Sequence, residues 1–112
     1  MTVNSAKVAA PAANAVVTDT GALAAGTYKF EVYLVVSDTV AVGKGLVIEH
    51  RNAANSATLQ NLGGSAPSNA NYFIYNGSFT INLNERIRVI AGTAAGAASS
   101  MYIACIITTL IA

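Results

Sequence analysis

Short segments of alternating apolar and polar residues dominate this sequence. In residues 27–37, TYKFEVYLVVS, the apolar positions Tyr28, Phe30, Val32 and Leu34 alternate with Lys29, Glu31 and Tyr33. Because successive side chains of a strand point to opposite faces, this pattern predicts a β-strand with one face in a core. No segment of useful length repeats its apolar residues with a helical period, and Pro11 interrupts the Ala-rich start. The chain is therefore expected to be all-β.

Further strands are expected where the same alternation recurs between turn residues. Clear segments lie at 46–52, 78–83, 85–90 and 101–112, and weaker ones at 2–8, 14–18 and 57–62. Asn76-Gly77 predicts a two-residue hairpin turn joining strands at 71–75 and 78–83, and 83–85 predicts a tight turn. The loop 91–99, AGTAAGAAS, is expected to join the last two strands. Seven or eight strands at this spacing predict an antiparallel β-sandwich of jelly-roll type.

The length of 112 residues fits one domain. Residues 1–13 are expected to form an extended N-terminal arm, because they can bury little by themselves but could add to the sheet edge of a neighbour. A frayed terminus explains the same residues equally well. Residues 14–112 are expected to form the β-sandwich domain.

The composition predicts a surface that a partner covers. Apolar residues make up 54% of the chain and charged residues only 10%, whereas soluble domains carry about a quarter. Six Lys and Arg against five Asp and Glu leave no charge excess for binding nucleic acid. The apolar end, residues 101–112, is shorter than the roughly twenty residues that cross a membrane. The start shows no secretory signal, so the protein is expected to stay where it is made.

The residues that usually carry chemistry are few and scattered. Cys105 and His50 are single, and the five acids have no spacing that predicts a metal site or a carboxylate pair. Gly92 and Gly96 lack the spacing and the Lys-Ser/Thr of a phosphate loop. We therefore expect no enzymatic activity, no cofactor and no metal. A hydrolase or lyase would need His50 and an acid to converge at the base of a deep cleft.

Charged side chains concentrate on two of the expected strands. These side chains belong to Glu49, Arg51, Glu85, Arg86 and Arg88. Cross-strand ion pairs on a solvated face explain them without any function, and contact with a partner is the alternative. Arg51, Arg86 and Arg88 are therefore interface candidates.

The last strand is apolar on both of its faces. Met101, Ile103, Cys105 and Ile107 alternate with Tyr102, Ala104 and Ile106, so one face can serve the core and the other needs cover. We therefore expect a homo-oligomer, with Ile103 or Ile106, whichever faces outward, at the interface.

Three segments carry a family resemblance: AGTYKFEVYL, GKGLVIEHRNAANSATLQNLGG and LNERIRVIAGTAAGAASSMYIACI. Their order, over roughly residues 14–112, resembles small β-sandwich proteins of tailed bacteriophage virions and is similar to TNF-like or C1q-like jelly rolls. The resemblance implies a non-enzymatic virion protein, assembled in the host cytoplasm, that decorates or cements the head by binding the lattice of the major capsid protein. It also implies a trimer.

A different role for the same fold is a tail or fibre component that binds a receptor or a carbohydrate. Its expected site is the aromatic cluster Tyr72, Phe73 and Tyr75. The chain lacks a collagen-like or coiled-coil stalk, which favours decoration over a fibre.

Overall fold

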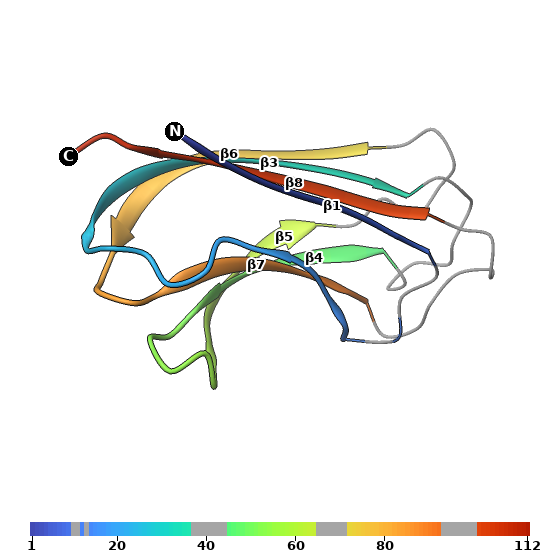
Figure 1. The fold of residues 1–112 in the computed structure, drawn as a ribbon, viewed down its shortest axis with the longest axis horizontal. Coiled ribbons are helices and arrows are strands. Elements are labelled where there is room, and N and C mark those ends of the chain that lie inside the picture. Colours follow the sequence, from blue (N-terminus) through green and yellow to red (C-terminus); the bar gives the residue numbers. More distant parts are fainter. Residues whose placement is uncertain (10–11, 13, 37–44, 65–71, 93–100) are drawn as a thin grey trace.

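The protein is a sandwich of two four-stranded antiparallel sheets (Figure 1). The computed structural model describes residues 1–9, 12, 14–36, 45–64, 72–92 and 101–112. The strands are β1 Thr2–Ala9, β2 Val16–Asp19, β3 Gly26–Val36, β4 Leu46–Arg51, β5 Thr58–Gly64, β6 Tyr72–Ile81, β7 Arg86–Ala91 and β8 Met101–Leu110. The predicted all-β antiparallel sandwich is confirmed, with eight strands. This part of the chain contains no helix, and hence none of a length and hydropathy that would span a membrane.

The strand order is that of a jelly roll. One sheet has the order β1-β8-β3-β6, and the other has the order β2-β7-β4-β5. The pairs are nested, since β1 pairs with β8, β2 with β7, β3 with β6 and β4 with β5. Two further pairs, β3 with β8 and β4 with β7, complete the two open sheets. The chain is thus a long antiparallel hairpin of eight strands, rolled so that its two sheets face each other.

The core lies between the inner faces of the four central strands. On β3, Phe30, Val32 and Leu34 are fully buried, as the alternation predicted. Leu46 and Ile48 of β4, Ile87 and Val89 of β7, and Tyr102, Ala104 and Ile106 of β8 meet them from both sheets. Each strand therefore contributes every second residue to one apolar layer.

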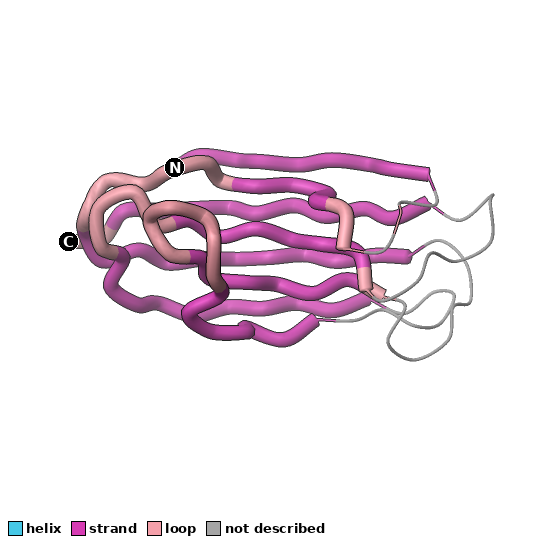
Figure 2. The backbone as a smooth tube through the Cα atoms, turned by 90° about the horizontal axis from the view of Figure 1, so that it is seen from below, coloured by secondary structure: helices cyan, strands magenta, loops and turns pink. Residues whose placement is uncertain are grey.

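The loops 20–25, 52–57 and 82–85 gather at one end of the sandwich, together with both termini (Figures 1 and 2). The loop before β7 is the tight turn that the sequence predicted, with a hydrogen bond of 3.1 Å from Glu85 N–H to the Asn82 carbonyl. Asn84 adopts a φ of 70°, which asparagine tolerates better than most residues. Leu83 lies in this turn and is 62% exposed, so the strand expected to reach residue 83 ends at Ile81. The predicted loop at 91–99 falls almost wholly outside the described residues, but β7 and β8 are present on either side of it.

The predicted hairpin at Asn76-Gly77 is wrong. β6 runs through both residues, and its register with β3 is unbroken from Gly26↔Ile81 to Val35↔Tyr72. Gly77 has another role there, because a Cβ at this position would overlap the phenol end of Tyr75. The glycine gives the Tyr75 ring its place on the inner side of β6, so a packing requirement explains the residue that the turn rule assigned to a hairpin.

The N-terminal segment is extended and pairs with its own chain. Thr2–Ala9 forms β1 at the edge of the first sheet, in register with β8 from Thr2↔Thr108 to Ala9↔Met101. Ala6 and Val8 are partly buried against the core. Most of the predicted arm therefore lies as a strand on the sandwich, while the boundary at residues 13 and 14 stays a prediction.

Gly64 should be the glycine of β5 that is hardest to replace. Its φ is 135°, and an added Cβ would overlap the backbone carbonyl oxygen of Leu46. Because backbone strain of this kind typically amounts to about 1–3 kcal/mol, Gly64→Ala should lower the free energy of unfolding by about 2 kcal/mol or more. Urea denaturation measures this, with Leu59→Ala, an exposed position of the same strand, as the control. Equal stability of the two variants would contradict the assignment.

Candidate functional site

A buried imidazole–carboxylate pair lies between the sheets, at the end where the loops gather. His50 of β4 and Glu85, just before β7, have side chains that are only 8% and 10% exposed, with His50 Nε2 3.0 Å from Glu85 Oε1. The Gln60 amide nitrogen of β5 lies 3.1 Å from His50 Nδ1, and the Phe79 ring lies 5.2 Å from the imidazole ring. When the Gln60 amide donates to Nδ1, the Nε2–H of the ring donates to Glu85.

The carboxylate of Glu85 is held in its charged form. Burial by itself would raise the pKa of Glu85, but the hydrogen bonds from the Asn82 backbone N–H and from His50 outweigh burial, and the pKa lies below its usual value. The Asn82 bond measures 2.9 Å. Glu85 therefore ties the turn before β7 to β4.

The pair brings His50 and an acid within hydrogen-bond distance, which the sequence did not predict. In a hydrolase, one ring nitrogen would face the nucleophile and the other the orienting acid. Here the carboxylate occupies Nε2 and the Gln60 amide occupies Nδ1, so both nitrogens have partners within the chain. The geometry suits a structural link between strands. Within the described residues, no three His, Cys, Asp or Glu side chains gather as a metal site.

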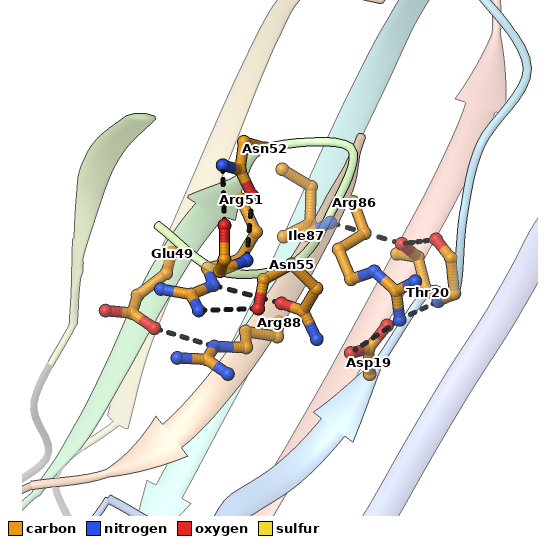
Figure 3. A network of polar contacts seen from close by, with 11 residues as sticks. Asp19, Thr20, Glu49, Arg51, Asn52, Asn55, Arg86, Ile87 and Arg88 are labelled. Carbon is orange, nitrogen blue, oxygen red and sulfur yellow. Dashed lines mark hydrogen bonds and ion pairs between the residues drawn. The ribbon is translucent and has the colours of Figure 1, made fainter. Parts of the chain in front are cut away.

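The outer face of the sheet β2-β7-β4-β5 carries a polar network (Figure 3). Arg88 Nε donates to Glu49 Oε1 at 2.8 Å, across the register pair Glu49↔Arg88. Arg51 donates to the Asn55 side-chain oxygen and carbonyl, both at 3.0 Å, and to Thr58 Oγ1 at 2.8 Å. Thr58 in turn donates to Glu49 at 3.0 Å. The network fixes the loop between β4 and β5 to the sheet.

The three arginine interface candidates all have partners within the chain. Arg86 lies 3.5 Å from Asp19 of β2, and Arg51 and Arg88 belong to the network just described. These contacts account for their positions without a partner protein. Glu85, which the sequence grouped with them on a solvated face, is instead buried beside His50, because the turn before β7 directs its side chain inward.

The outer face of the other sheet is apolar across its middle rows. The register sets Ser5, Cys105, Tyr33 and Ile74 in one row. The neighbouring rows are Lys7, Ile103 and Val35 on one side and Val3, Ile107, Glu31 and Asn76 on the other. We call the apolar members of these rows the apolar face: Val3, Tyr33, Val35, Ile74, Ile103, Cys105 and Ile107.

Several side chains of the apolar face are open to solvent in the single chain. Val3 is 54% exposed, Ile74 50% and Tyr33 37%, while Ile103, Cys105 and Ile107 are half-buried. Tyr33 Oη donates to Glu31 at 3.1 Å, and the hydrogen bond and charge of Glu31 raise the pKa of Tyr33, so the phenol stays neutral. With four strands about 4.8 Å apart and ten residues rising about 3.3 Å each, the whole outer face of this sheet covers roughly 600 Å², and the apolar face is its middle part.

The structure separates the two apolar interface candidates of β8. Ile103 points outward and belongs to the apolar face, whereas Ile106 points inward and is fully buried in the core. Ile106 is therefore not available to a partner, which corrects its place among the candidates. The physical reason is register, since pairing of Ile106 with the buried Val32 sets both on the inner side.

Of the aromatic cluster expected of a receptor-binding module, the structure describes only the side chain of Tyr75. Tyr75 is half-buried on the inner side of β6, packed against the core. The backbones of Tyr72 and Phe73 belong to β6, but their side chains lie outside the described part of the structure.

Comparisons with known proteins give no family for this chain. No protein-family model matches it, and no curated protein matches it.

Glu85 should contribute to stability only above acidic pH. Its pKa is lowered in the folded protein, so the stabilisation is fully present above the unfolded pKa of about 4.3 and is lost as the pH falls through the folded pKa. Glu85→Gln should lower the free energy of unfolding by about 1 kcal/mol at pH 7, with a smaller difference at pH 3. Denaturation series at both pH values test this, with Glu31→Gln as a control that removes the same charge from the surface. A difference that stays constant between pH 7 and pH 3 would contradict the role of the Glu85 charge.

Proposed function

We propose that this protein is a non-enzymatic structural protein of a tailed-bacteriophage virion, which decorates the capsid by binding the lattice of the major capsid protein. The observation that carries the proposal is the apolar face. The apolar face lies in the middle of a sheet face of roughly 600 Å², which hides about 1,200 Å² when it is paired with a similar surface, at the lower end of the range for specific protein interfaces. At about 25 cal/mol per Å² of apolar area, leaving the apolar side chains in water would forgo several kcal/mol.

Two other observations support a binding role over a catalytic one. The imidazole of His50 has both nitrogens occupied within the chain, and the arginines of the polar network are held by their own sheet and loop. The jelly-roll order of the strands fits the resemblance to small virion proteins. The trimeric state rests on that resemblance alone, and the association itself rests on the apolar face.

Substitutions on β8 test the association. Ile103→Asp places a charge on the apolar face and should dissociate copies of the protein that associate through this face. The circular dichroism spectrum should stay of β type. Ile106→Asp buries an unpaired charge in the core and should unfold the chain. Sedimentation equilibrium of both variants and of the unmodified protein measures the outcome. An unmodified protein that is monomeric at micromolar concentration would remove the argument for an oligomer.

The location of the protein in a virion tests the rest of the proposal. A density map of the phage particle that contains this chain should show the eight-stranded sandwich on the outer capsid surface, repeated with the symmetry of the capsid lattice. Density for the sandwich on the tail or on a fibre would favour the alternative role in receptor or carbohydrate binding. Its absence from every part of the particle would overturn the proposal.

A further inference from the structure

Each sheet of an open sandwich ends in two edge strands, whose unpaired N–H and C=O groups can pair with another chain. The four edges of this protein are β1 and β6 in one sheet and β2 and β5 in the other. Natural proteins prevent unwanted pairing with short strands, bulges, charged side chains or proline at the edge. The four edges differ sharply in these features.

Three edges carry such features. β2 has four residues and a register shift between Val16 and Thr18. β5 has two register shifts, and its last two residues, Gly63 and Gly64, have φ values of 101° and 135°. β1 carries Lys7, and Pro11 follows it closely in the sequence.

β6 carries none of them. It has ten residues, YFIYNGSFTI, without a charged residue or a proline, and its register with β3 contains no shift over those ten residues. Among the described residues, its backbone pairs with β3 alone, which leaves alternate N–H and C=O groups on its other side for another strand.

We propose that the free edge of β6 pairs antiparallel with β6 of a second copy of this chain, so that the two copies share one continuous sheet. A strand without charges can lie against itself without setting like charges opposite each other. A two-fold axis through the middle of β6 also satisfies both edges at once, so that this contact taken by itself makes a closed pair. This contact uses the edge of the sheet and is separate from the apolar face.

The proposal deepens the proposed self-association by naming a second contact, and the two contacts can be tested apart. Asn76 lies at the middle of β6, is exposed, and stands opposite Glu31 on β3. Asn76→Lys therefore gains an ion-pair partner in its own chain but sets two lysines opposite or diagonal to each other across the two-fold axis. Asn61→Lys, on the bulged edge β5, is the matched control.

The experiment uses full-length protein with Ile103→Asp, which removes the apolar face from the association. Sedimentation of this variant between about 1 and 100 µM should show a monomer–dimer equilibrium, and adding Asn76→Lys should shift it to monomer, with at least a tenfold weaker association. Adding Asn61→Lys should leave the equilibrium unchanged. Amide hydrogen exchange in β6 should slow as the protein concentration rises and should not slow with Asn76→Lys.

The outcomes separate the two contacts. If the Ile103→Asp protein is monomeric throughout while the unmodified protein is an oligomer, the edge pairing is wrong and the apolar face stands. If the unmodified and Ile103→Asp proteins are equally dimeric and Asn76→Lys makes both monomeric, the edge pairing stands and the apolar face carries no association. If Asn61→Lys weakens the dimer as much as Asn76→Lys does, the contact does not lie at β6 and the proposal is overturned.

Discussion

The packing of two sheet faces across one apolar layer is the constraint on which the rest of this structure depends. Most of the fully buried side chains come from the four central strands, β3 and β8 of one sheet and β4 and β7 of the other, and Ile81 of the edge strand β6 joins them. Each of these strands joins the layer with alternate residues, so its register decides which side chains reach solvent. A shift by one residue would exchange the core for the surface. The apolar face, the polar network and the buried His50–Glu85 pair all follow from that register.

The sequence predicted well those features that depend on local alternation. Tyr28 to Leu34 and Leu46 to Arg51 have the inward and outward faces that their patterns indicated. Alternation could not predict whether Ile103 or Ile106 faces outward, because β8 is apolar on both sides. The register with β3 determines that Ile103 faces outward and Ile106 inward. The partner of His50 was beyond prediction for a similar reason, since Glu85 is 35 residues away along the chain and reaches His50 only through the pairing of β4 with β7. The turn rule failed at Asn76-Gly77 because another requirement, room for the Tyr75 ring over Gly77 on the same face of β6, explains the same glycine.

The two outer faces of the sandwich differ in how far their side chains find partners or cover within their own chain. On the sheet β2-β7-β4-β5, Arg51, Arg88 and Glu49 find partners on neighbouring strands or in the adjoining loop. Part of that face is therefore a closed network, in which these side chains already have partners in their own chain. On the sheet β1-β8-β3-β6, the middle rows contain apolar side chains that the described part of the chain leaves partly exposed.

The sheet that carries the apolar face also has the more open edge. The sheet β2-β7-β4-β5 ends in a short strand, β2, and a bulged strand, β5, whereas the sheet β1-β8-β3-β6 ends on one side in β6, which is long, regular and uncharged. A sheet that kept its apolar face and its open edge in water would be a site of aggregation. A chain with only 10% charged residues has little repulsion to prevent that outcome. Both features therefore make sense together if one sheet is the associating side of the molecule and the other, with its internal ion pairs, is the side left to solvent.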